Sequence, residues 1–185
     1  ATRLDMARLK ALTLAVTGKV SETAEDAAAA FDPDALLGMD LGAEPVLVEA
    51  ARALFADRLS EHREQLAGLE GEIAQRSAEA RMIGASIQML EGTVPLLAER
   101  VRARESLAQK EYGSRLVYLE LQQELVEREG ELAVEQHRLT ETRAAVATLK
   151  RRKAELAATF RALANEELID HLQRAAALEI GRAHV

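Results

Sequence analysis

The chain has 185 residues, of which almost half are apolar and only 3% aromatic, with a net charge of −7 and no cysteine. Without cysteine there are no disulfides or thiolate metal sites, and this absence fits both a periplasmic and a cytosolic protein. An acidic chain is a poor partner for nucleic acid, because phosphate binding needs clustered Lys and Arg. Ala, Leu, Glu, Arg and Gln dominate, which is typical of long helices and coiled coils.

The first 44 residues predict one helix followed by a connector. Apolar residues recur at helical spacing over residues 4–20, so we expect a helix there. Residues 21–44 change to Ala and acidic residues and contain Pro33, which biases the residue before it away from helical geometry. The connector has room for one helical turn within 22–30. The apolar residues expected to pin it onto neighbouring helices are Phe31, Leu36, Leu37 and Leu41.

Two long stretches with a heptad pattern follow, residues 45–111 and 115–180. Pro45 suits the first turn of a helix, where its missing N–H costs nothing. An apolar stripe that repeats every seven residues predicts the seam of a coiled coil. In the first stretch, the core positions are Leu59, His62, Leu66, Leu69, Ile73, Arg76, Ala80, Ile83, Ile87, Leu90, Val94, Leu97, Val101 and Arg104. In the second, they are Tyr118, Leu121, Leu125, Arg128, Leu132, Glu135, Leu139, Thr142, Val146, Leu149, Lys153, Leu156, Phe160 and Leu163.

A short turn at residues 112–114 allows the second stretch to fold back on the first. Pairing about this turn sets many apolar core positions against one another, while the layers between them are mixed: Val94 faces Arg128, Ile87 faces Glu135 and Leu69 faces Lys153. The facing pairs are then Val101–Leu121, Leu97–Leu125, Leu90–Leu132, Ile83–Leu139, Ile73–Leu149, Leu66–Leu156 and Leu59–Leu163. A register slipped by one heptad also gives apolar pairs. The register given above is preferred because it places the turn residues at its centre.

The predicted fold class is therefore all-α: a long antiparallel coiled-coil helical hairpin with a short additional N-terminal helix packed at its base. Residues 1–44 belong to the base, and Ala1 and Ile180 should lie at the same end. Pro95 should kink the outgoing helix, because proline removes one backbone hydrogen bond. Beyond Phe160 the apolar stripe shifts in phase, which indicates a stutter. Residues 181–185 break the pattern and are interpreted as a frayed end or a cloning residue.

Nothing in the sequence predicts an enzyme, a cofactor or a metal site. The histidines lack metal-ligand spacing, and Glu167 with His171 one turn later is interpreted as a surface pair. His62 at a core position is interpreted as a packing residue. No nucleophile stands with a base and an orienting group, and no glycine-rich phosphate loop occurs. No apolar run reaches the length of a membrane span.

The turn region is where we expect function. Gly113 would supply turn freedom, and Ser114 is a good N-cap for the returning helix. The functional alternative is that the tip docks on a partner protein. Leu107 would then be the apolar anchor, and Arg104 and Ser114 would be flanking polar contacts.

At these residues the sequence resembles the hemolysin-D-type membrane fusion proteins, the periplasmic adaptors of bacterial type I secretion. Residues 114–132 resemble the return helix of that family, and residues 44–58 resemble the start of its outgoing helix. In the family, an Arg–Leu–Ser/Thr motif at the hairpin tip meets an outer-membrane channel of the TolC type. The commonest spacing places Leu four residues after Arg and Ser seven residues after Leu.

Leu107 and Ser114 match this motif, whereas its arginine position holds Ala103. The resemblance therefore assigns the arginine role to Arg104, with Arg102 as the substitute. It implies a non-enzymatic adaptor whose hairpins form a hexamer, as a periplasmic tube between an inner-membrane ABC transporter and the outer-membrane channel. The cargo would be an unfolded exported protein.

The resemblance also implies that this chain is a hairpin domain whose membrane anchor, lipoyl and β-barrel parts lie outside it. The protein would then lie in the periplasm, anchored to the inner membrane by a segment absent from this chain. Two alternatives stay open. One is a multidrug-efflux adaptor of related architecture, and the other is a cytosolic coiled-coil scaffold or tether, which would form an outstretched dimer.

Overall fold

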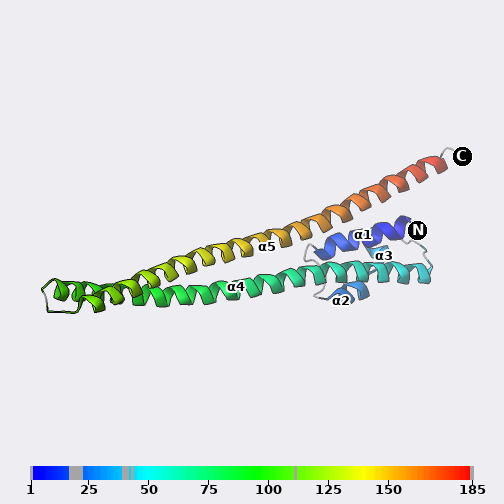
Figure 1. The fold of residues 1–185 in the computed structure, drawn as a ribbon. Helices are drawn as coiled ribbons and strands as arrows, with labels where there is room; N and C mark the ends of the chain where they lie inside the picture. Colours follow the sequence, from blue (N-terminus) through cyan, green and yellow to red (C-terminus); the bar gives the residue numbers. More distant parts are fainter. Residues whose placement is uncertain (1, 17–22, 39–41, 43, 111, 184–185) are drawn as a thin grey trace. The chain divides into compact units, whose positions relative to one another are not determined.

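The computed structural model describes residues 2–16, 23–38, 42, 44–110 and 112–183. In this part of the chain all regular structure is helical (Figure 1). The long helices α4 and α5 pack as a hairpin and α1 contacts both, so the predicted fold class is confirmed. The scaffold alternative predicted two outstretched helices, and the hairpin differs from that prediction. The helices are α1 (Thr2–Val16), α2 (Ala24–Ala29), α3 (Pro33–Leu37), α4 (Pro45–Gln109) and α5 (Arg115–Ala183).

The chain divides into two compact units, which we name the base unit and the tip unit. The base unit comprises Ala1–Glu70 and Arg151–Val185, and the tip unit comprises Gly71–Lys150. Both long helices contribute to both units. The expectation that the two chain ends lie together rests partly on Ala1, which is outside the described residues.

The connector contains two helices where one helical turn was expected. In α2, the Thr23 hydroxyl accepts a hydrogen bond from the N–H of Asp26 (3.0 Å), as an N-cap residue does. The second helix, α3, begins at Pro33, which the sequence analysis treated only as a helix breaker. Proline is well tolerated at the first helical position, and Asp32 caps the helix by accepting from the N–H groups of residues 34 (3.0 Å) and 35 (3.2 Å). The helical turn expected within residues 22–30 is confirmed as α2, whereas α3 was not predicted.

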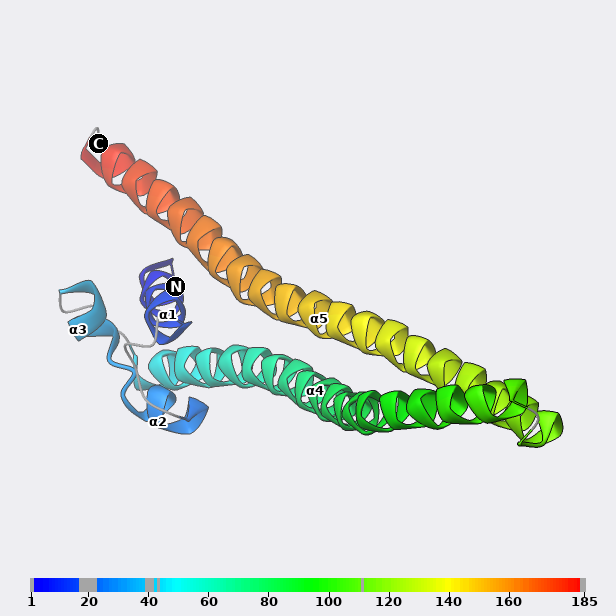
Figure 2. The same ribbon diagram turned by 90° about the vertical axis from the view of Figure 1, so that its left-hand side faces the viewer.

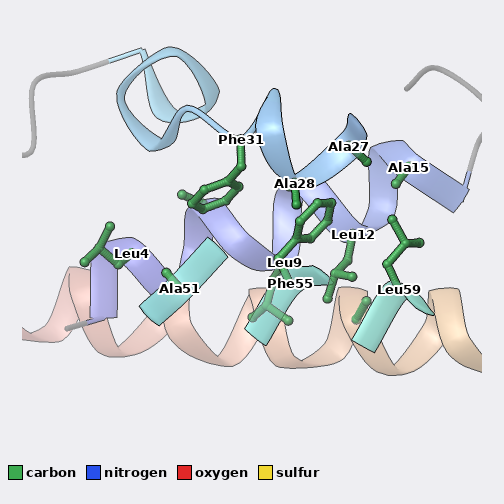
Figure 3. Packing of buried hydrophobic residues seen from close by; sticks show 13 residues of the cluster. Leu4, Leu9, Leu12, Ala15, Ala27, Ala28, Phe31, Ala51, Phe55 and Leu59 are labelled. Atoms are coloured by element: carbon green, nitrogen blue, oxygen red, sulfur yellow. The ribbon is translucent and has the colours of Figure 1, made fainter. Parts of the chain in front are cut away.

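In the base unit, α1 and α2 lie beside the first part of α4 (Figure 2). Four helices and Phe31 contribute to its hydrophobic core (Figure 3). Phe31 stacks on Phe55 of α4, with 5.7 Å between ring centroids and 23° between ring planes. Leu36 and Leu37 of α3 pack against this core, so three of the four expected pinning residues are confirmed, while Leu41 lies outside the described residues. The core residues are Leu4, Ala7, Leu9, Ala11, Leu12, Ala15, Ala27, Ala28, Phe31, Ala51, Phe55, Leu59 and Ala164.

The seam between α4 and α5 follows the predicted heptads. On α4 the buried seam residues lie at predicted core positions, whereas Arg76 and Arg104 are exposed there. Pro95 lies inside α4, which continues through it without a break. The buried α4 seam residues are Leu59, His62, Leu69, Ile83, Ile87, Leu90, Leu97 and Val101.

Two contacts in the base unit identify the register. The ring of His62 stacks on that of Phe160, with centroids 4.0 Å apart and 12° between the planes. Lys153 forms an ion pair with Glu70. Both contacts follow from the preferred register, because a slip of one heptad would place His62 opposite Glu167 instead.

The α5 helix departs from the predicted stripe near Phe160. Leu163, expected to face Leu59, is exposed, and the residue buried beside Leu59 is Ala164. The cause is α1, which packs on this part of the hairpin and buries a different side of α5. Of the residues expected beyond the shift, Leu168 is partly buried and Leu172 is exposed. The helix also continues to Ala183, past the expected end at Ile180.

Candidate functional site at the hairpin tip

The turn at the tip is closed by a backbone hydrogen bond. Helix α4 ends at Gln109, and the N–H of Tyr112 donates to the carbonyl of Leu107 (3.1 Å), one of the carbonyl groups that the helix end leaves without a partner. Helix α5 begins at Arg115, and the carbonyl of Ser114 accepts from the N–H of Tyr118 (3.3 Å). Ser114 therefore occupies the expected N-cap position of α5.

Gly113 is needed for a different reason than the sequence suggested. Among the described residues, the glycines with positive φ are Gly38 and Gly42, so Gly113 does not use the left-handed region. A Cβ atom on Gly113 would lie 3.2 Å from Cβ of Leu107 and 3.4 Å from the backbone nitrogen of Ala108. The turn therefore favours glycine, because its backbone passes close to Leu107 and Ala108 in the last turn of α4.

The predicted contact residues are all exposed on the tip unit. Arg102, Arg104, Leu107 and Ser114 each present their side chains to solvent. Within the described part of the chain, neither arginine forms an ion pair, and the Ser114 hydroxyl makes no hydrogen bond to another residue. These groups are thus not used to hold the hairpin together, and they are available to a partner.

A shallow depression of about 370 Å³ distinguishes the two arginines. Arg104 lines it together with Arg100, whereas Arg102 does not. The opposite wall belongs to α5 and is formed by Val117, Glu120, Leu121 and Glu124. The depression therefore combines apolar side chains with two arginines and two carboxylates, the mixed composition that is usual at a protein–protein interface.

Sequence reasoning missed two apolar contact candidates at the tip. Tyr112 is 84% exposed and Leu116 is 66% exposed, and both lie close in sequence to Leu107 and the turn. Tyr112 was predicted only as part of the turn at residues 112–114. Its aromatic ring was the available signal, because an exposed Tyr at a turn that needs no aromatic residue is typical of an interface.

The base unit carries the other titratable cluster. His62 is buried, at 4% exposure, and neither ring nitrogen has a hydrogen-bond partner among the described residues. Burial lowers the pKa of His62 because it disfavours the charged imidazolium. The ring borders a cavity of about 180 Å³ between α1, α4 and α5. The sequence-based interpretation of His62 as a packing residue is confirmed by its stack on Phe160.

Glu167 has a different partner from the one expected. Its two carboxylate oxygens accept hydrogen bonds from both terminal nitrogens of Arg58, each at 2.8 Å. The hydrogen bond from Arg58 lowers the pKa of Glu167, and the same bond raises the pKa of Arg58. The Arg58–Glu167 pair joins α4 to α5. The expected partner, His171, has only a smaller electrostatic effect on the pKa of Glu167.

Metal-binding clusters and membrane-spanning helices are absent from the described residues. No group of three His, Cys, Asp or Glu side chains in this part of the chain could hold a metal ion. None of the described helices combines the length and the apolar character needed to cross a bilayer.

Comparison with known proteins identifies a family. The model of the family described as "AprE, long alpha-helical hairpin" matches residues 5–180, which is nearly the whole chain. A search of curated proteins finds no match.

Proposed function

Since the chain belongs to the family of AprE-type long α-helical hairpins, we propose that it is the hairpin domain of a periplasmic adaptor in type I protein secretion. The hairpin bridges an inner-membrane ABC transporter and an outer-membrane channel of the TolC type. The adaptor is anchored to the inner membrane by a segment outside this chain and works as a hexamer. It performs no chemistry and serves to hold the two membrane components together.

The tip is the part that docks on the channel. Leu107, Tyr112 and Leu116 are large apolar side chains exposed around one turn, and such a group is typical of a contact surface. Arg104 and Ser114 provide charge and hydrogen-bonding capacity beside them, and neither is used within the described part of the chain. The single observation that carries the proposal is this exposed apolar tip on a hairpin of the AprE type.

Arg104 is the better candidate for the arginine contact. It lines the depression between α4 and α5, where a partner's polar groups would also meet Glu120 and Glu124. Arg102 lies outside this depression. A docked helix end would bury the Leu107 side chain and leave the arginine at the rim, where it steers the approach more than it adds affinity.

The test is Leu107→Asp in the complete adaptor. A charge at the apolar anchor should abolish recovery of the outer-membrane channel with the adaptor and stop export, because a central apolar contact dominates a small interface. Helicity should not change, since Leu107 is exposed. Helicity is measured by circular dichroism of the chain, and recovery by affinity purification from detergent-solubilised membranes.

The matched control is Val134→Asp. Val134 is an apolar residue on α5 outside the tip, and it is 62% exposed against 41% for Leu107. This variant should recover the channel as the unchanged adaptor does. Normal export by the Leu107 variant, or equal loss in both variants, would refute docking through the tip.

A further inference from the structure

The cavity between α1, α4 and α5 is bordered by a buried polar group that lacks a hydrogen-bond partner. We name it the base cavity; its volume is about 180 Å³, and its border includes Leu12, His62, Phe160 and Ala164. His62 is 4% exposed, and neither of its ring nitrogens has a partner among the described residues. Buried polar groups in folded proteins are almost always hydrogen-bonded. An unpaired imidazole beside a cavity therefore indicates that a bound molecule supplies the partner.

The other polar side chains that line the base cavity are satisfied by one another. Arg58 donates two hydrogen bonds of 2.8 Å to the carboxylate of Glu167. The amide of Gln65 donates to the carboxylate of Glu61 at 3.3 Å. A single buried water needs about two to four polar partners, whereas these pairs leave the imidazole as the one unpaired polar side chain in the lining. The missing partner of His62 is thus better supplied by a molecule that also contacts the apolar walls.

The walls of the base cavity are apolar and partly aromatic. Leu12 of α1 is 0% exposed and Ala164 of α5 is 4% exposed. The ring of Phe160 stacks on that of His62, with 4.0 Å between centroids and 12° between planes. Aromatic rings attract further aromatic rings in offset or edge-to-face contacts. These walls therefore favour a ligand whose body is a flat aromatic ring.

The volume of the base cavity restricts the ligand to one ring. An apolar protein cavity of about 150 Å³ holds benzene, and the base cavity measures about 180 Å³. Sites for drug-sized ligands are larger, at about 300–1,000 Å³. A six-membered aromatic ring with one small substituent is the size that fits.

The imidazole of His62 decides what that substituent is. Burial lowers the pKa of His62, so the ring is neutral and offers one donor and one acceptor nitrogen. A hydroxyl group pairs with either nitrogen, because it both donates and accepts hydrogen bonds. A carboxylate or an ammonium group would lose its hydration against the apolar walls. The substituent that suits the site is therefore a neutral hydroxyl.

We propose that the base cavity is a binding site for monocyclic phenols. The aromatic ring lies against Leu12, Phe160 and Ala164, and the hydroxyl group pairs with the imidazole of His62. Because its walls come from α1, α4 and α5, a bound phenol ties α1 to the two long helices. All of these residues belong to the base unit, so the site does not depend on the proposed docking at the tip.

Titration of the full chain with phenol, and separately with toluene, tests the site by NMR. Phenol should shift the imidazole resonances of His62 saturably, with a dissociation constant on the order of 1 mM, which a one-ring ligand can reach. Toluene has the same ring without the hydroxyl, so it should bind about tenfold more weakly, the factor expected for one net hydrogen bond. The exposed His137 in the tip unit is the internal control, and its resonances should not move.

His62→Leu separates the hydrogen bond from the apolar contacts. This variant should bind phenol about tenfold more weakly and toluene as the unchanged chain does, because only the pairing with the hydroxyl is lost. Binding is followed at the ring resonances of Phe160, and circular dichroism verifies that the variant is folded. The matched control is His137→Leu, which should leave both affinities unchanged.

Three results would overturn the proposal: no saturable shift at His62 with phenol, equal affinities of the unchanged chain for phenol and toluene, or equal shifts at His62 and His137. The comparison of the two ligands needs no substitution, so it decides the question even where His62→Leu fails to fold. Each of these results leaves tip docking standing, since that proposal is decided by Leu107→Asp.

Discussion

Replacing Phe55 with alanine tests whether α1 and the connector are held on the hairpin by the base core. Phe55 is 1% exposed, and its ring stacks on Phe31 at 5.7 Å (Figure 3). Truncation of a buried phenylalanine to alanine costs about 3–5 kcal/mol, from lost transfer free energy and the cavity left behind. That loss is a large fraction of the roughly 5–15 kcal/mol that stabilises a typical domain.

The assay is urea unfolding of the chain followed by far-UV circular dichroism. Helix α1 has 15 residues, too few for a stable helix in isolation, so its helical signal should be lost together with the core. The control is Leu54→Ala on the same helix, where the side chain is 51% exposed and the expected change is within about 0.5 kcal/mol. Equal shifts of the unfolding midpoint in the two variants would refute this account of the base.

Two further predictions concern ionisation and backbone approach. Because burial lowers the pKa of His62 below its ordinary value of about 6.5, the unfolded chain binds the proton more readily. The contribution of His62 to the free energy of unfolding should therefore be complete above the ordinary pKa, and it should decline as the pH falls below that value. In His62→Phe this decline, measured by urea unfolding across the pH range, should be smaller, and an unchanged decline would contradict the assignment. Gly113→Ala should lower the thermal midpoint, because its Cβ would press on Leu107. Gly130→Ala should raise the thermal midpoint, because a helical alanine is more stable than a glycine by up to about 1 kcal/mol and the new Cβ would meet nothing within 4 Å. Shifts of the same sign in both glycine variants would contradict the close approach at the tip.

The hairpin could be predicted because its information is local and periodic. The heptad placed Ile83, Ile87 and Leu90 in the seam, and all three are buried. The phase of the stripe near Leu163 could not be predicted in the same way. The burial of Ala164 in its place depends on α1 packing there, and a repeat along one helix does not say which third helix will cover it.

The connector shows a different limit. Pro33 predicts a break in a helix and equally permits the start of one, and the choice depends on whether the residue before it can cap. Asp32 does so by accepting two backbone hydrogen bonds. A proline preceded by a capping residue such as Asp32 is the sequence signal of a helix start, and this signal predicts α3.

At the tip, the sequence predicted which residues are accessible but not why the turn has its shape. Leu107, Arg104 and Ser114 are exposed, as a docking surface requires. Gly113 was expected to provide an unusual backbone conformation, and instead it allows close approach to Leu107. Such a contact depends on the three-dimensional course of the turn, which residue type alone does not specify.

The central claim, that the tip of this hairpin docks on an outer-membrane channel, is tested most directly by site-specific photocrosslinking in secreting cells. A photoreactive residue replaces Leu107 in the complete adaptor, and in a parallel strain it replaces Val134. The account predicts a covalent adduct with the channel from position 107 and none from position 134. No channel adduct at position 107, or equal adducts at both positions, would contradict it.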